Sequence, residues 1–326
     1  MSTFWNGKSV LVTGGLGFIG SHLTSKLVES GSRVTILDNV SNPSFSREDQ
    51  IQKDIELIRG ECKDPMTAKR ACKGKQVVMN LAAKVAGVAY NQTHKGSMLS
   101  ENLLIQATMM EAAQKAGVTR FLAVSSAVVY PPDAKIPTPE FEGLRGEPEE
   151  VNEGYGWAKR MNELLARYYH EEFGFEVAVV RPYNCYGPGD HFFPTPTHVV
   201  PSLIRRVMEE EDPVVVWGSG RQTRAFLYVE DLVQGMMLVT EKYAVADPVN
   251  LGSNEEVTMA QLIETIVRVS GKTVNVVFDT TKPDGSPRRS SDNRKAKEKI
   301  GFVADTKLEE GLRRTIEWYK RELSSQ

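Results

Sequence analysis

The sequence predicts a doubly wound α/β fold, in which helices cover both faces of a parallel sheet, followed by a smaller C-terminal α/β unit. In the first half of the chain, short apolar and β-branched runs alternate with stretches of helical periodicity. Such β-α alternation is typical of a parallel sheet between two helical layers. After about residue 182 a cluster of prolines interrupts the alternation and favours loops. We therefore expect two domains.

Each expected element follows from its own pattern. Continuous apolar runs, which suit buried parallel strands, lie at residues 9–12, 33–37, 55–58, 76–80, 120–124 and 176–180. Helical patterns lie between them at 19–30, 64–72, 99–116 and 155–173. Later patterns predict helices at 199–210 and 230–242, and strands at 213–217, 249–252 and 274–278. We expect a sheet domain over residues 1–182, to which segments near 225–255 return, and a second domain over residues 183–326.

Composition excludes several classes of function. The 326 residues include 40 Lys+Arg and 42 Asp+Glu, whereas binding to nucleic acid or an anionic membrane needs a basic excess. The three cysteines lie in no Cys-x-x-Cys or Cys/His cluster, so we expect neither a metal site nor disulfides. No apolar run reaches the roughly 20 residues of a membrane span. A strand expected from the ninth residue leaves no room for a signal peptide, so a cytoplasmic enzyme is expected.

A glycine-rich turn follows the first expected strand. It places Gly14, Gly17 and Gly20 just before and within the start of the first helix, where backbone N–H groups and the helix dipole can face a pyrophosphate. Asp38 ends the second strand at the spacing of a dinucleotide site. A carboxylate there accepts hydrogen bonds from the adenosine ribose and repels a 2′-phosphate. Because Asn39 and not arginine follows it, NAD is favoured over NADP.

Three further residues suggest acid–base chemistry. Tyr155 and Lys159 lie one turn apart on the same face of an expected helix. The phenol of an exposed tyrosine has a pKa near 10, and a nearby ammonium together with a positive nicotinamide ring would lower that pKa towards neutrality. Ser126, just after a strand end, can hydrogen-bond the same substrate oxygen. The set predicts a tyrosine base.

These motifs together resemble the extended short-chain dehydrogenase/reductases of the nucleotide-sugar epimerase/dehydratase group. The matching segments, in order along nearly the whole chain, are residues 13–20, 80–83, 125–126, 155–159 and 181–188. The resemblance implies a Rossmann-type NAD-binding domain, a C-terminal domain for the nucleotide sugar, and a homodimer formed through paired helices. It implies that Ser126, Tyr155 and Lys159 are catalytic. The implied cofactor-binding residues are Gly14, Gly17, Phe18, Ile19, Gly20, Asp38, Asn39, Ala82 and Lys159.

Several stretches are most similar to those of GDP-L-fucose synthases and GDP-mannose 3,5-epimerases. These enzymes use a cysteine two residues after the catalytic serine, a position that Val128 occupies here. Their histidine is matched by His198, while Cys185 is a conceivable substitute thiol. The resemblance implies a substrate-binding set of Lys84, Asn184, His198, Arg224 and Arg288. We expect the charged residues from 289 to 299 to form a solvated face.

The leading hypothesis is an NAD-dependent nucleotide-sugar epimerase acting at C4 on a GDP- or UDP-linked sugar. A 4-epimerase needs no second carbon acid or base, which suits an alkyl side chain at Val128. One alternative is a fucose-synthase-like 3,5-epimerase and 4-reductase, against which Val128 and Asp38 both count. The other is a non-catalytic NAD-binding subunit, which would be expected to carry a damaged Ser/Tyr/Lys set. The sequence does not name the base or the sugar.

Overall fold

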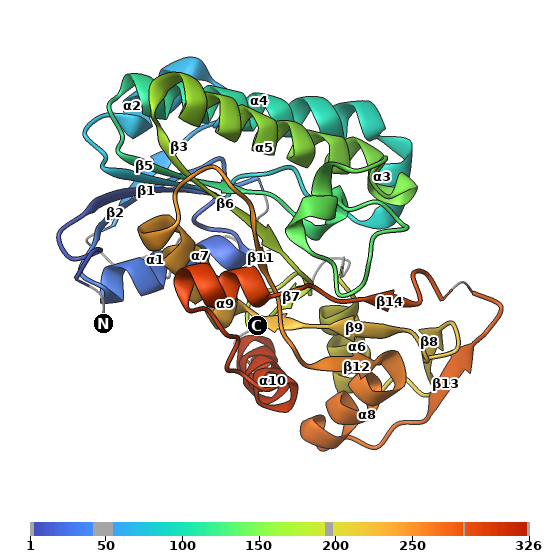
Figure 1. Cartoon of the computed structure of the whole chain (residues 1–326). Helices are drawn as coiled ribbons and strands as arrows, with labels where there is room; N and C mark the ends of the chain where they lie inside the picture. The colour runs from blue at the N-terminus through green and yellow to red at the C-terminus, as the bar shows by residue number, and fades with distance from the viewer. Residues whose placement is uncertain (1–2, 42–54, 193–197, 283, 325–326) are drawn as a thin grey trace.

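A computed structural model describes residues 3–41, 55–192, 198–282 and 284–324 (Figure 1). Its main layer is a seven-stranded parallel sheet in the order β11-β6-β5-β4-β1-β2-β3, which confirms the predicted doubly wound fold. The strands are β1 (Ser9–Thr13), β2 (Arg33–Asp38), β3 (Glu56–Arg59), β4 (Val77–Asn80), β5 (Arg120–Val124), β6 (Glu176–Pro182) and β11 (Val249–Leu251).

The strand order reverses at β1, which pairs with β2 on one side and with β4 on the other. Thr13, the last residue of β1, lies opposite Leu37 of β2 and Asn80 of β4. The residues that follow these three strands therefore meet at one edge of the sheet. In open α/β sheets, ligands bind in the crevice at such a switch point.

Helices cover both faces of the sheet (Figure 1). Apolar side chains of α2 (Pro65–Cys72), α4 (Lys95–Lys115) and α5 (Glu153–Phe173) pack on one face. Those of α1 (Phe18–Glu29), α7 (Val229–Lys242) and α9 (Arg294–Ile300) pack on the other. A further helix, α3 (Val88–Thr93), which the sequence did not predict, precedes α4. No helix among the residues described here is both long and apolar enough to cross a bilayer.

The chain leaves the sheet after β6, returns to it as α7 and β11, leaves again, and returns once more as α9. The elements beyond the sheet surround a second apolar core and form three small sheets, β10-β7, β12-β9-β14 and β13-β8. Their bounds are β7 (Cys185–Tyr186), α6 (Val199–Met208), β8 (Val214–Trp217), β9 (Thr223–Ala225), β10 (Leu227–Tyr228), β12 (Glu256–Thr258), α8 (Met259–Ser270), β13 (Val276–Asp279), β14 (Arg288–Arg289) and α10 (Leu308–Ser324). Short 3₁₀ helices lie at Ala127–Val129, Glu140–Leu144 and Glu150–Asn152.

Candidate active site

The glycine turn lies at the switch point, between β1 and α1. Gly14 has a φ of +65°, a left-handed conformation that glycine adopts without steric cost. The N–H of Gly17 donates to the carbonyl of Gly14 at 3.1 Å, and α1 begins at the next residue. A Cβ at Gly20 would lie 2.0 Å from the Gly14 oxygen. The turn and the helix therefore touch backbone to backbone, which only glycine permits.

The carboxylate of Asp38, at the end of β2, holds this turn through hydrogen bonds. Its Oδ2 accepts a hydrogen bond from the N–H of Leu16 at 3.0 Å, and its Oδ1 accepts one from the N–H of Val40 at 2.9 Å. A carboxylate has about four lone-pair sites, so capacity remains for two ribose hydroxyls. The side chain of the next residue, Asn39, donates to Glu61 at 3.1 Å. Asp38 therefore shapes the turn in addition to the adenosine contact expected from the sequence.

A cavity of about 520 Å³ opens beside the turn. Its lining includes eight of the nine expected cofactor residues, namely Gly14, Gly17, Phe18, Ile19, Gly20, Asp38, Asn39 and Ala82. Lys84 and His198, expected to bind substrate, line the same cavity. The glycine turn and the carboxylate at the strand end, which line this cavity together, fit a dinucleotide.

Lys159 connects α5 to the carboxyl end of β5. Its Nζ donates to the carbonyl of Val124 at 2.7 Å and lies 5.3 Å from the centre of the Tyr155 ring. Two residues after Val124, Ser126 begins a 3₁₀ turn, in which its Oγ accepts from the N–H of Val128 at 3.4 Å. The structure therefore gathers the three expected catalytic residues around one strand end.

Burial sets the protonation states of this group. It lowers the pKa of Lys159 to about 8, an effect that the negative charge of Glu163 opposes. It raises the pKa of the Tyr155 phenol above its ordinary value. At neutral pH, Lys159 is therefore mainly charged and Tyr155 is a neutral phenol. Burial also raises the pKa of the Cys185 thiol well above its ordinary value, which makes that thiol a poor substitute base.

The imidazole of His198 lies against the buried carboxylate of Asp190. Its Nδ1 lies 2.9 Å from Oδ1 of Asp190, whose side chain is 1% exposed. Desolvation opposes a charge on the imidazole, but the hydrogen bond and the charge of Asp190 outweigh it and raise the pKa of His198. The ring of His191 packs edge-on at 5.7 Å from that of His198. This group forms a polar end of the cavity, distant in sequence from the glycine turn.

Two arginines meet where β14 pairs with β9. Arg224 lies opposite Arg289 in the strand register, and burial, with the charge of Arg289, lowers the pKa of Arg224. Arg288, expected to bind substrate, instead forms a bidentate pair with Glu256 at 2.8 and 2.9 Å. Arg289 was expected on a solvated face, but its side chain is half-buried and pairs with Glu149, because side chains alternate across a strand. Had residues 288 and 289 been assigned to a strand, the alternation of side chains would have predicted that Arg288 and Arg289 point to opposite faces.

Asn184, the remaining expected substrate residue, lies just before β7 with a φ of +23°. Its Nδ2 donates to the carbonyl of Ala225 at 3.0 Å, which holds this loop against the end of β9. Lys84 follows the third strand end of the switch point and places its Nζ 5.6 Å from the centre of the Tyr90 ring. The structure thus connects Lys84 and His198 through one cavity but holds Asn184, Arg224 and Arg288 in the elements beyond the sheet.

The sequence of this chain matches a family model over residues 10–252, and that model describes the NAD-dependent epimerase/dehydratase family. The chain belongs to this family. It is an enzyme of the extended short-chain dehydrogenase/reductase type and uses NAD, which confirms the family, the enzyme class and the cofactor predicted from the sequence.

Known proteins of two kinds are similar to this family member. The probable GDP-L-fucose synthase 1 of Oryza sativa subsp. japonica is 35% identical over 318 residues, covering 96% of this chain and 92% of that protein. A solved epimerase from Methanothermobacter thermautotrophicus superimposes with a TM-score of 0.89 at 30% identity, covering 99% of this chain and 95% of that one. UDP-glucose 4-epimerase from Thermotoga maritima, solved with UDP-glucose, superimposes with a TM-score of 0.87 at 29% identity. The match covers 97% of this chain and 99% of that one.

Proposed function

We propose that the protein is an NAD-dependent nucleotide-sugar epimerase that inverts C4 through a transient 4-keto sugar. The observation that carries the proposal is the turn that Ser126 begins, in which the Ser/Tyr/Lys set is intact but the side chain two residues on is Val128. An alkyl side chain neither takes nor gives a proton. This turn therefore supports oxidation and reduction of the C4 carbinol, and not removal of a proton from the neighbouring carbons C3 or C5. Similarity to a UDP-glucose 4-epimerase supports the same reaction.

Each catalytic side chain has a separate task. Tyr155 takes the proton of the C4 hydroxyl and later returns one, while Ser126 donates a hydrogen bond to the same oxygen. Burial keeps Tyr155 protonated in the cofactor-free protein, and the Lys159 ammonium together with the positive nicotinamide ring of bound NAD would stabilise its phenolate. NAD, when bound, supplies the hydride acceptor and donor at C4. The residues of the glycine turn, Asp38, Asn39, Ala82 and Lys159 hold it.

The nucleotide part of the substrate is assigned to the elements beyond the sheet. Arg224 and Arg289 bring two guanidinium groups together on neighbouring strands, and guanidinium matches the geometry of a diphosphate. Glu149 pairs with Arg289, and the bound diphosphate would add the second negative group that two cations require. We assign Lys84, Asn184 and His198 to the sugar. We assign Arg288 to the rim, because its side chain is more exposed than that of Arg289 and is held outside by Glu256. Residues 1–182 with the returning α7, β11 and α9 would form the cofactor domain and the rest the substrate domain.

We further propose a homodimer formed through α4 and α5, which pack side by side on one face of the sheet (Figure 1). Leu104 and Tyr168 on these helices are 53% and 50% exposed, as an apolar dimer face requires. Met109 and Met110 of α4 are fully buried against the sheet. They therefore take no part in the proposed dimer face.

The reaction is tested by isotope content. The protein is incubated in D₂O with UDP-, GDP- and dTDP-sugars, and the products are examined by NMR and mass spectrometry. A 4-epimerase returns product without carbon-bound deuterium, because the migrating hydrogen stays on the cofactor. Tyr155→Phe should lower turnover by about 10²–10⁴-fold while NAD stays bound. Deuterium at C3 or C5, or full activity of Tyr155→Phe, would contradict the proposal.

One observation favours a second candidate, a fucose-synthase-like 3,5-epimerase and 4-reductase. The imidazole of His198, held by Asp190 at 2.9 Å, is the kind of group that protonates a carbon centre, and GDP-L-fucose synthases are among the relatives. This candidate predicts deuterium at C3 or C5 and net consumption of a reduced nicotinamide. The D₂O experiment, repeated with a GDP-4-keto-6-deoxyhexose and a reduced nicotinamide, therefore separates the two.

A further inference from the structure

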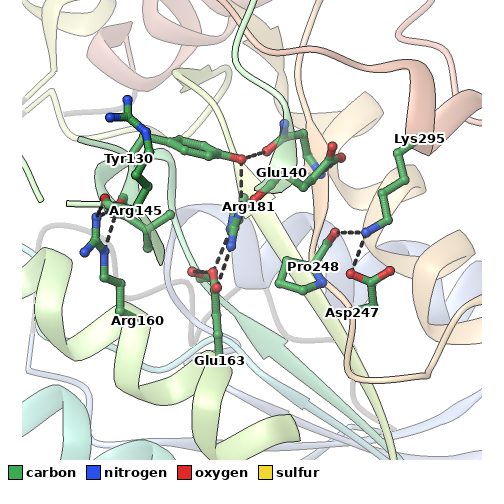
Figure 2. A network of polar contacts seen from close by, with 12 residues as sticks. Tyr130, Glu140, Arg145, Arg160, Glu163, Arg181, Asp247, Pro248 and Lys295 are labelled. Carbon is green, nitrogen blue, oxygen red and sulfur yellow. Dashed lines mark hydrogen bonds and ion pairs between the residues drawn. The ribbon is translucent and has the colours of Figure 1, made fainter. Parts of the chain in front are cut away.

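A buried ion pair lies directly behind the catalytic residues. Arg181 of β6 donates from Nε to Oε1 of Glu163 at 2.7 Å and from Nη2 to Oε2 at 2.6 Å. The two residues are 2% and 5% exposed, and Figure 2 shows them at the centre of a larger polar network. A buried pair of this kind gives little net stability compared with apolar side chains of similar volume. Its presence therefore calls for another role.

The carboxylate of this pair reaches the catalytic turn. Oε1 of Glu163 also accepts a hydrogen bond from Oγ of Ser125 at 2.5 Å, and Ser125 directly precedes Ser126. On α5, Glu163 follows Lys159 by four residues, so the two side chains share one face of the helix. The negative charge of Glu163 favours the charged form of Lys159. One carboxylate thus faces both the serine turn and the lysine.

The guanidinium that holds this carboxylate is itself fixed from the opposite side. Nη1 of Arg181 donates to the hydroxyl of Tyr130 at 2.9 Å and to the carbonyl of Glu140 at 2.6 Å. The Tyr130 hydroxyl in turn donates to Oδ1 of Asn250 on β11 at 2.5 Å (Figure 2). A Cβ at Gly143 would lie 2.3 Å from Nη2 of Arg181, so the loop packs directly on the guanidinium. Arg181 has no room for another orientation.

We propose that Glu163 is a positioning residue of the active site, whose carboxylate, fixed by Arg181, holds the Ser125–Ser126 turn and supplies the negative charge that faces the Lys159 ammonium. The proposal rests on the proposed roles of Tyr155 and Lys159. Glu163 touches neither substrate nor cofactor and acts through its neighbours.

The charged and titratable groups facing Glu163 come from several elements. Lys159 and Arg160 lie on α5 itself, Arg181 on β6, and Tyr130 directly after the 3₁₀ turn that follows β5. Glu140 joins them through Arg181. Removing the charge of Glu163 takes away the carboxylate that favours the charge on Lys159 and leaves Arg160 and Arg181, whose charges oppose each other, without a shared counter-ion. The charge on Lys159 is then disfavoured, and with it the phenolate of Tyr155.

The test follows the titration of Tyr155 in the NAD-bound protein, without any sugar. The ultraviolet absorbance of the phenolate is recorded against pH and corrected with Tyr155→Phe. Glu163→Gln should move the midpoint to higher pH by about one unit or more. It should also lower kcat at neutral pH by about 10-fold, with KM and NAD affinity changed less than about 3-fold. A midpoint that coincides with that of the unchanged protein would overturn the proposal.

Two further variants keep the test valid if Glu163→Gln does not fold. In Glu163→Gln/Arg181→Met no buried guanidinium is left unpaired, and the midpoint should still rise. Ser125→Ala keeps the ion pair, so it should lower kcat without moving the midpoint; unchanged kcat would overturn the positioning of the turn. The matched control is Glu142→Gln, because Glu142 is also a buried carboxylate, 8% exposed and paired with Arg145 at 2.7 Å, and it should change neither quantity.

The outcomes also separate this proposal from the proposed function. If the unchanged protein inverts none of the sugars, the epimerase assignment fails, but the phenolate titration needs no sugar and still tests the role of Glu163. If the sugars are inverted and Tyr155→Phe is inactive, while Glu163→Gln titrates like the unchanged protein, only the positioning role fails.

Discussion

Replacing Gly20 by alanine tests the cofactor cradle at its tightest point. The new Cβ would lie 2.0 Å from the oxygen of Gly14 and 2.8 Å from its carbonyl carbon. Real Cβ atoms essentially never approach closer than 3.0 Å, so helix α1 and the turn must separate by about 1 Å. The atoms in the way belong to the backbone and have no rotamer to change.

That displacement decides the size of the effect. A hydrogen bond of ordinary length no longer holds when its atoms move apart by about 1 Å, and hydrogen bonds from N–H groups to a charged partner contribute about 1.5–3 kcal/mol each. Loss of two such bonds to the cofactor diphosphate would weaken NAD binding by about 3–6 kcal/mol. This corresponds to a fall in affinity of about 10²–10⁴-fold.

The assay is calorimetric titration of the cofactor-free protein with NAD, beside circular dichroism to verify the fold. Gly96→Ala is the matched control, because Gly96 is exposed in α4 and a Cβ there meets nothing within 4 Å. The control should bind NAD like the unchanged protein. A folded Gly20→Ala protein whose NAD affinity lies within about 3-fold of the control would refute the reasoning.

Three other predictions concern single side chains. Lys159→Met should raise the pH at which activity appears, because the phenolate of Tyr155 loses its ammonium; a pH–rate profile for kcat measures this, and an unmoved acidic limb would contradict it. Asp38→Ala should lower the ratio of NAD to NADP affinity by about 10-fold, although both affinities fall as the turn loosens; an unchanged ratio would show that the carboxylate does not select the cofactor. Light scattering at micromolar concentration should give a dimer that Leu104→Glu with Tyr168→Glu dissociates, and a monomeric unchanged protein would remove the dimer proposal.

Most of the sheet could be predicted because its signals are local. Each buried strand is a continuous apolar run, and a helical pattern follows almost every one. The exceptions depend on contacts between distant segments. Helix α4 begins at Lys95 rather than at residue 99. Its first residue, Lys95, forms an ion pair with Glu153 of α5 at 2.6 Å. Helix α3 has only six residues, and its Asn91 donates to Asn152 at 2.9 Å, a contact that no periodicity indicates.

The same distinction applies to the site. The glycine turn and Asp38 belong to one β-α-β unit, so their spacing in the sequence already places them together. Arg289 and Glu163 escaped prediction for different reasons. The partner of Arg289 across the strands, Arg224, lies 65 positions earlier in the chain, while Glu163 resembles any acid on an exposed helix until Arg181 is packed against it.

The pairing of β11 with β6 determines where the chain can be truncated without exposing a strand edge. Truncation at residue 182, the expected domain boundary, would remove β11 and expose the N–H and C=O groups of β6 along a long, apolar edge. Such an edge is a template for aggregation. Loss of α7 would also uncover Ala178 and Val180 of β6 on the sheet face beneath it. A recombinant cofactor half would therefore need an internal deletion, in which a short linker joins β6 to α7 and the chain continues through β11.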